Sequence, residues 1–100
     1  MKKAIQIDER DNVATATSNV SENETLEVIS PEGAVILKPK TFDAITFGHK
    51  LALVDLEPGD EIIKYGEIIG VASKRIMVGA WVHTHNVESA TVPTSALQEE

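Results

Sequence analysis

Histidine is the residue type in this chain best suited to chemistry, since imidazole both binds metals and transfers protons near neutral pH. The chain has 3 histidines, and two of them, His83 and His85, stand two positions apart. On a strand their rings point to the same face, with Cα atoms about 7 Å apart, so both could reach one ion or one substrate while Thr84 faces away. Taken alone, such a pair is more often two ordinary exposed histidines than a site. Nothing in the spacing makes the third, His49, a further ligand.

Two short segments place a cation beside a glycine. In residues 48–50, Gly-His-Lys precedes an apolar strand and offers two groups that bind anions or carry protons. In residues 64–67, Lys-Tyr-Gly-Glu predicts a tight turn whose cation and phenol suit a carboxylate substrate. Both segments are equally typical of turns with solvated side chains. Trp81, the single Trp, is expected to be a packing anchor or an interface residue.

The elements that position these residues are predicted to be short β-strands with little helix. Val, Ile and Thr together number 28, against 6 Leu, and β-branched side chains favour strands. No segment longer than about ten residues shows a helical stripe, and one short turn is expected near residues 41–47. Turn residues separate most of the predicted strands, which span Lys3–Asp8, Val13–Thr17, Thr25–Ser30, Ala34–Lys38, Lys50–Val54, Glu61–Lys64, Glu67–Ala72 and Trp81–His85.

A motif in which one apolar residue precedes a turn residue and another follows it repeats along the chain. Its physics is that of a turn entering a strand, with Gly or Asn at the position that adopts left-handed backbone. The two Gly copies are more similar than chance would give, whereas the similarity of the Asn copy is equally well explained by coincidence. The copies are Leu56-x-x-Gly59-x-x-Ile62, Ile76-x-x-Gly79-x-x-Val82 and Val20-x-x-Asn23-x-x-Leu26.

Composition excludes several functional classes. The chain has 100 residues, no Cys and a formal net charge of −7, which indicates one small domain without disulfides or thiolates. An acidic chain is not expected to bind nucleic acid or an anionic membrane through its overall field. No apolar stretch has the length of a membrane span or of an export signal, so the cytoplasm is the expected location.

Taken in order, the motifs closely resemble the SAF domain of the altronate/galactarate dehydratase family. The series covers most of the chain, from Asp8 to Glu88, and is far more specific than any one motif. The segments that carry the resemblance are Asp11-Asn12-Val13-Ala14, Gly48-His49-Lys50-Leu51-Ala52, residues 59–72 from Gly59-Asp60-Glu61 through Lys64-Tyr65-Gly66-Glu67 to Val71-Ala72, and Gly79-Ala80-Trp81-Val82-His83-Thr84-His85-Asn86.

The resemblance implies a mostly β, β-clip (SAF-like) fold of short, strongly bent strands. Its domain would span residues 1–88, followed by a tail, 89–100, that is flexible or docks on a partner. In this family the SAF domain is either the N-terminal part of a long enzyme or a separate small subunit, and a chain of 100 residues resembles the small subunit.

The resemblance also implies an activity. Family members eliminate water from sugar acids, which are 2,3-dihydroxy carboxylates such as altronate or galactarate, and a related two-subunit enzyme eliminates sulfite from sulfolactate. A divalent metal, typically iron(II), stabilises the charge formed when a proton leaves the carbon beside the carboxylate. A separate large catalytic subunit would supply most of this machinery and would hold the metal mainly itself. Without that partner, uncovered apolar surface would favour self-association of this chain into a homo-oligomer.

Site residues follow from the resemblance position by position. His83, His85 and His49 are the expected catalytic residues, and His83 and His85 the expected metal ligands or proton-transfer groups. Substrate would be bound by Lys50, Lys64, Tyr65 and Asn86, with the lysines neutralising its carboxylate. The turns would be formed by Gly48, Gly66, Gly59 and Gly79.

Two other classes of function stay open. A stand-alone SAF module would bind or position a ligand without catalysis, as in sialic acid synthases or in chaperones of flagellar and pilus assembly. A purely structural subunit would use its turns for folding and assembly alone. Against the structural subunit, three histidines and two lysines stand at turns and strand ends, where sites usually lie.

Overall fold

The computed structural model of this chain describes residues 1–89, and these form short β-strands with no helix. The predicted mostly β class is thereby confirmed. The predicted tail lies, apart from Ser89, outside the described residues. Within residues 1–89 no helix is long and apolar enough to cross a membrane. The strands are β1 (Lys3–Ile5), β2 (Val13–Ala16), β3 (Glu27–Ile29), β4 (Val35–Leu37), β5 (Lys50–Ala52), β6 (Glu61–Lys64), β7 (Glu67–Ala72), β8 (Trp81–Val82) and β9 (Val87–Glu88).

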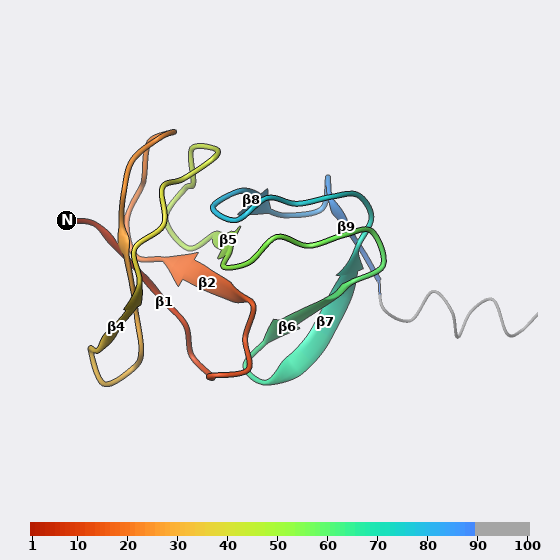
Figure 1. Cartoon of the computed structure of the whole chain (residues 1–100), viewed down its shortest axis with the longest axis horizontal. Coiled ribbons are helices and arrows are strands. Elements are labelled where there is room, and N and C mark those ends of the chain that lie inside the picture. Colours follow the sequence, from red (N-terminus) through yellow and green to blue (C-terminus); the bar gives the residue numbers. More distant parts are fainter. Residues whose placement is uncertain (90–100) are drawn as a thin grey trace, which may run out of the picture.

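The strands form two sheets. The larger has the order β4-β3-β1-β2-β5-β8 and the smaller the order β6-β7-β9. All neighbours are antiparallel except β1 and β3, which run parallel. In Figure 1 the strands β1 and β4 lie on one side of the molecule and β6, β7 and β9 on the other, with β2, β5 and β8 between them.

Two predictions about strands need correction. Seven predicted strands occur with trimmed or unchanged ends, but the expected strand Trp81–His85 ends at Val82, and β9 was not anticipated. The strand ends early because Asn86 closes a turn: its Oδ1 accepts from the His83 N–H at 2.9 Å, while its own N–H donates to the His83 carbonyl at 3.1 Å. His83 and His85 therefore lie on a turn, and the alternation expected of a strand does not apply to them.

The repeated turn motif occurs four times within residues 1–89. Its apolar residues are buried in every copy, and its turn residue has a positive φ each time, including Asn23 at 62°. The copy centred on Asn23 is thus structurally equivalent to the Gly copies. A fourth copy is Ile45-x-x-Gly48-x-x-Leu51. It was not predicted from the sequence, because residues 48–50 were interpreted as candidate site residues.

The four copies pair into two similar units. Bridges join Val20 to Ile45 and Leu56 to Ile76, the leading apolar residues of each pair. The turn glycines repeat the same bond: the Gly48 N–H donates to the carbonyl of Ala16 at 2.9 Å, and the Gly79 N–H donates to that of Ala52 at 2.8 Å. In each case the acceptor lies four residues before the leading apolar residue of the partner copy. We call residues 16–51 the first turn pair and residues 52–82 the second turn pair.

The ladder β2-β5-β8 separates two hydrophobic cores. Because side chains alternate along a strand, neighbouring residues of the ladder enter different cores. Ala14 and Leu51 face each other across the ladder and belong to the first core, whereas Val13 and Ala52 belong to the second. Lys50 shares the strand face of Ala52, so the second core continues toward its side chain.

Candidate functional site

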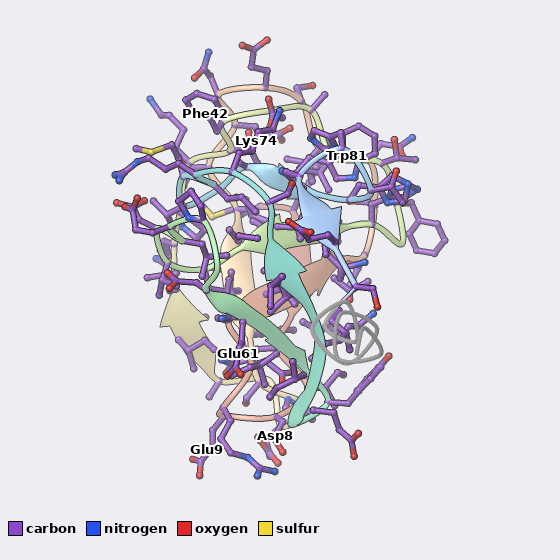
Figure 2. All side chains as sticks on the ribbon, turned by 90° about the vertical axis from the view of Figure 1, so that its right-hand side faces the viewer. Asp8, Glu9, Phe42, Glu61, Lys74 and Trp81 are labelled. Carbon is purple, nitrogen blue, oxygen red and sulfur yellow. The ribbon has the colours of Figure 1, made fainter. Side chains whose placement is uncertain are left out.

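All three histidines gather around one indole. The pairing of Lys50 with Val82 in the β5-β8 ladder places His49 beside His83, with 5.2 Å between the ring centroids. Trp81 stacks on His83 at 5.0 Å and 10°, and lies 4.9 Å from His85 at 41°. We call His49, Trp81, His83 and His85 the ring cluster. Figure 2 shows Trp81 near β8, toward the end of the molecule opposite Asp8.

A hydrogen bond fixes the orientation of His49. The Trp81 Nε1–H donates to His49 Nδ1 at 3.1 Å, and an indole N–H can only donate. His49 Nδ1 is therefore an acceptor, and the neutral ring carries its proton on Nε2. Trp81 also packs against the first core. The indole thus combines its expected role as a packing anchor with that of holding an imidazole in place.

The backbone around Trp81 is held by two polar side chains, the partly buried Asp43 and the buried Asn86. Asp43 Oδ2 accepts from the Trp81 N–H at 3.0 Å, and Asn86 Nδ2 donates to the Trp81 carbonyl at 2.8 Å. Asn86 is 5% exposed, and its Oδ1 is engaged by His83. With both ends of its amide in use, Asn86 acts here as a positioning residue. Asp43 was not among the predicted site residues, and no local motif singles it out.

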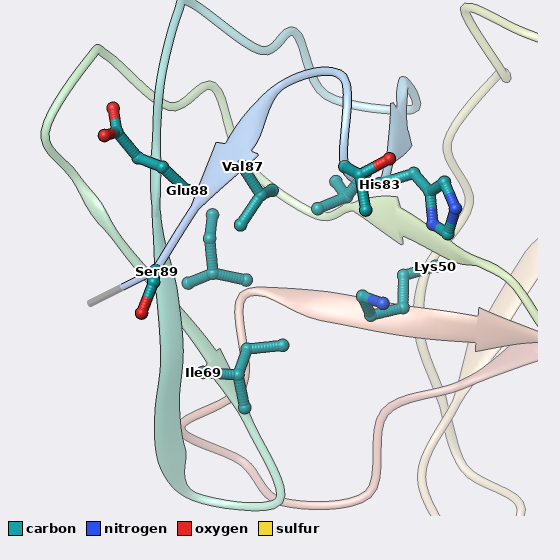
Figure 3. Close-up of a pocket in the computed structure, with 9 residues that line it drawn as sticks. Lys50, Ile69, His83, Val87, Glu88 and Ser89 are labelled. Carbon is teal, nitrogen blue, oxygen red and sulfur yellow. The ribbon is translucent and has the colours of Figure 1, made fainter. Parts of the chain in front are cut away.

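On the other face of the ladder lies a pocket of about 330 Å³, which we call the lysine pocket. Figure 3 shows Lys50 and His83 at one end of it, and Ile69, Glu88 and Ser89 around the other. The buried side chains of Ile62 and Val82 and the partly buried Val87 complete its apolar wall. His83 is thus shared between the lysine pocket and the ring cluster.

The two lysines predicted to bind substrate lie close enough to influence each other. Burial, followed by the positive charge of Lys64, lowers the pKa of Lys50 below its ordinary value. The Lys64 ammonium lies 4.9 Å from the centroid of the Tyr65 ring, a cation–π arrangement. Neither lysine forms an ion pair within residues 1–89, in contrast to Lys2 and Lys3, which contact glutamates. The structure thus brings together two positive charges that have no carboxylate partner in the part of the chain that it describes.

The turn that carries Lys64 is held by a pair of side chains that sequence reasoning missed as positioning residues. Asp11 is buried, and its Oδ1 accepts from the Gly66 N–H at 2.8 Å. Asn12 donates to the Glu61 carbonyl and accepts from the Ile63 N–H, both at 2.8 Å. The signal was present, because Asp11-Asn12 opens the ordered series of motifs.

The turn also requires unusual backbone conformations. Tyr65 has a φ of 56°, and Gly66 follows with a φ of 73°. The bond from Asp11 to Gly66 fixes these two residues against the body of the domain. The phenol of Tyr65 is exposed and lies beside the Lys64 ammonium.

The histidines do not by themselves form a metal centre. Among residues 1–89 no group of three His, Asp, Glu or Cys side chains is arranged to hold an ion. His49 Nδ1 is occupied by the indole, and His85 joins the cluster through Trp81. The described residues therefore do not fit a resident metal, and any ion at His83 and His85 would need ligands from outside this part of the chain.

Comparison with known proteins gives one consistent result. Residues 2–90 match the family described as the altronate/galactarate dehydratase SAF domain. The chain is 37% identical over 89 residues to an altronate dehydratase of Bacillus subtilis, covering 89% of this chain and 17% of that protein. It is 38% identical over 85 residues to an altronate dehydratase of Escherichia coli, covering 85% of this chain and 16% of that protein.

A shorter relative matches part of the chain. Over 47 residues the chain is 47% identical to the alpha subunit of (2R)-sulfolactate sulfo-lyase from Chromohalobacter salexigens, covering 47% of this chain and 50% of that subunit. The chain therefore spans about a sixth of the length of the two altronate dehydratases and about half that of this sulfo-lyase subunit.

Proposed function

This chain belongs to the family of altronate/galactarate dehydratase SAF domains, and we propose that it is the small subunit of a hydro-lyase. In this role it helps to bind a sugar acid, a 2,3-dihydroxy carboxylate, from which a separate large catalytic subunit eliminates water. The relatives of this family are dehydratases and lyases, which supports lyase chemistry. The cytoplasm remains our prediction for where the enzyme works.

The observation that carries the proposal is that Lys50, which lines the lysine pocket, and Lys64, which acts on it as a like charge, form no ion pair within residues 1–89. In a chain with a net charge of −7, positive charge left free beside a pocket suits an anionic ligand. A carboxylate bound by Lys50 and Lys64 would gain charge-assisted hydrogen bonds of roughly 1.5–3 kcal/mol each. Tyr65 would add a hydroxyl to the polar edge of the site.

The elimination needs a proton removed beside the carboxylate and a proton given to the departing hydroxyl group. His83 is the imidazole on the pocket wall, so in our proposal it holds or moves one of these protons. His49 and Trp81 pack against His83 and orient its ring. His85 is exposed beside Trp81 and would serve the interface with the catalytic subunit.

We assign the divalent metal, iron(II) by family expectation, to the catalytic subunit. The described residues gather no three ligands, so no step of the mechanism passes through a metal on this chain. The partner would also cover exposed apolar residues of this chain, among them Ile68 and Ile69 beside the pocket. In its absence we expect self-association through that surface.

A second candidate is the alpha subunit of a sulfolactate sulfo-lyase. It is favoured by the similarity to a sulfo-lyase alpha subunit, half of whose length this chain covers. Both candidates use the same carboxylate-binding lysines and differ in the leaving group, water or sulfite. A stand-alone binding module is the third reading, and it predicts ligand binding without turnover.

The test is to co-express this chain with a large dehydratase-like subunit encoded beside it and to assay altronate, galactarate and sulfolactate with iron(II). We expect a stable complex in which Lys50→Met or Lys64→Met raises KM about tenfold or more, because each removes a charge-assisted bond. His83→Ala should lower kcat. Lys74→Met, at an exposed lysine away from the pocket, is the matched control. A large subunit that alone turns over these acids as well as the complex does would refute the proposal.

A further inference from the structure

Lys50 has an environment that differs from that of the other lysines. Its side chain is partly buried and enters a pocket whose wall is largely apolar, formed by Ile62, Ile69 and Val87 among others. Lys38, by comparison, is exposed and contacts Glu27 at 3.9 Å. An amine that is removed from water and has no carboxylate partner loses much of what keeps it protonated. Lys50 is therefore placed as a nucleophile as well as a cation.

The charged and titratable groups that face Lys50 come from several elements. Lys64, at the end of β6, acts on it as a like charge. His83, after β8, and Glu88, on β9, line the same pocket, and neither forms an ion pair with Lys50 within residues 1–89. Burial and the Lys64 charge both lower the pKa of Lys50, so at a given pH a larger fraction of its amine is neutral than in an exposed lysine.

We propose that Lys50 captures 2-oxo acids covalently as an imine, with Lys64 binding the carboxylate of the captured acid. A carbonyl compound without a carboxylate would leave Lys64 unused, whereas a 2-oxo acid places its carboxylate one bond from the carbon that Lys50 attacks. The pocket of about 330 Å³ has room for a small acid of this class. This capture goes beyond the proposed lyase function and requires no catalytic subunit.

The chemistry balances without a further reactant. The neutral Nζ of Lys50 forms a bond to the carbonyl carbon, and the π electrons move to the oxygen, which takes up a proton as the nitrogen loses one. The resulting carbinolamine loses its hydroxyl group as water once that group is protonated, the nitrogen lone pair forms the C=N bond of an iminium, and the iminium nitrogen then returns the proton to give the imine. His83, on the pocket wall, is the group that moves these protons. Amine and ketone thus give imine and water, with no change in oxidation state.

The test uses the full chain alone, with pyruvate as the probe and sodium cyanoborohydride to reduce any imine to a stable secondary amine. Peptide mapping by mass spectrometry then locates the adduct. We expect Lys50 to carry most of it, and Lys74, an exposed lysine, to carry little at the same pH. Adduct spread evenly over Lys50, Lys40 and Lys74 would overturn the proposal, because Lys50 would then react no faster than an ordinary surface lysine.

Two variants separate the roles of the lysines. Lys50→Arg keeps the positive charge but should abolish the site-specific adduct, with circular dichroism showing that the fold is kept. Lys64→Met should lower the ratio of adduct formed with pyruvate to adduct formed with butanone, a ketone without a carboxylate. An unchanged ratio would refute the role given to Lys64. Since no catalytic subunit is present, these outcomes are independent of whether the lyase assay succeeds.

Discussion

The two turn pairs share the same bridge and the same turn hydrogen bond but carry very different side chains. In the first turn pair, the residues after Gly48 are His49 and Lys50, whereas in the second those after Gly79 are Ala80 and Trp81. Because β5 pairs with β8, His49 of the first pair contacts Trp81 of the second, and Lys50 lies opposite Val82. The comparison shows that a repeated scaffold supplies the geometry, and that chemistry depends on which side chains stand at the two positions after each turn residue.

The same comparison holds for the turns that stay outside the site. The residues after Asn23 and Gly59 are Glu24 and Asp60, whose carboxylates accept from the backbone N–H of their own turns at 2.8 Å. These side chains support the turn and contribute no group to the lysine pocket. The equivalent position therefore supports the turn in these two copies, carries the ring-cluster residue His49 in the copy centred on Gly48, and is the buried Ala80 in the copy centred on Gly79.

The largest expected difference concerns the turn glycines. Gly48 and Gly79 have similar φ values, 85° and 87°, but a Cβ on Gly79 would lie 2.3 Å from the Lys40 carbonyl oxygen, whereas one on Gly48 would meet nothing within 4 Å. Gly79→Ala should lower the free energy of unfolding by about 3 kcal/mol or more, since a backbone atom must move. Gly48→Ala should cost about 1–2 kcal/mol from backbone strain alone.

Urea unfolding followed by circular dichroism measures both glycine variants. Equal losses at the two positions would contradict the close approach of Lys40 to Gly79. If Gly48→Ala were the more damaging, the equivalence of the two turn pairs would itself be in error.

A smaller difference is expected between two asparagines that support turns. Asn86 is buried and bonds to the backbone of His83 and Trp81, whereas the Asn19 side chain accepts one exposed bond from the Phe47 N–H. Asn86→Ala should cost about 2–3 kcal/mol, because it leaves two partly buried backbone groups without their hydrogen-bond partner. Asn19→Ala should cost about 0.5–1 kcal/mol. The urea midpoints of the two variants measure these losses. A larger loss of stability for Asn19→Ala would contradict the role of Asn86 as the residue that supports the site.

The smallest effect is expected in the β1-β2 loop, outside both turn pairs. Hydrogen bonds from the Arg10 guanidinium at 2.9 Å, and then from its backbone N–H, lower the pKa of Asp8 to about 2. Because the folded pKa lies below the unfolded one, the stabilisation is present above about pH 4 and is lost as the pH falls toward 2. Asp8 lies at the surface, only partly buried, and its partner Arg10 is exposed, so the contribution is small.

Unfolding midpoints measured across this pH range test the loop. The Asp8→Asn variant should lose less stability between pH 4 and 2 than the unaltered chain does. If the midpoints of the two proteins fell equally over this pH range, Arg10 would not form its hydrogen bonds with the Asp8 carboxylate in solution.

Local chemistry allowed much of the fold to be predicted. β-branched composition and turn residues located eight of the strands, and β6 and β7 have the predicted ends because a Tyr-Gly turn separates two clear apolar runs. The strand through His83 was predicted too long, since the bond that ends it comes from the side chain of Asn86. A side chain that replaces a ladder bond leaves no mark in hydrophobic periodicity.

The site was harder to predict than the fold, because it depends on register between distant segments. His83 and His85 were expected to lie together because they are two residues apart, yet the contact of His83 with His49 follows from the pairing of β5 with β8. No local signal in either strand specifies that pairing. The proximity of Lys50 to Lys64 likewise depends on the packing of the β6-β7 hairpin, which Asp11 and Asn12 hold from the start of β2.

The single Trp of the chain, held between imidazoles, makes the site observable by optical means. A protonated imidazole in contact with an indole quenches its fluorescence, and the emission wavelength follows the polarity around the ring. Since His83 touches both Trp81 and the lysine pocket, a ligand that enters the pocket should change the emission of Trp81 without any attached dye. The unlabelled chain is therefore its own binding sensor, suited to screening acids by titration before any enzymatic assay exists.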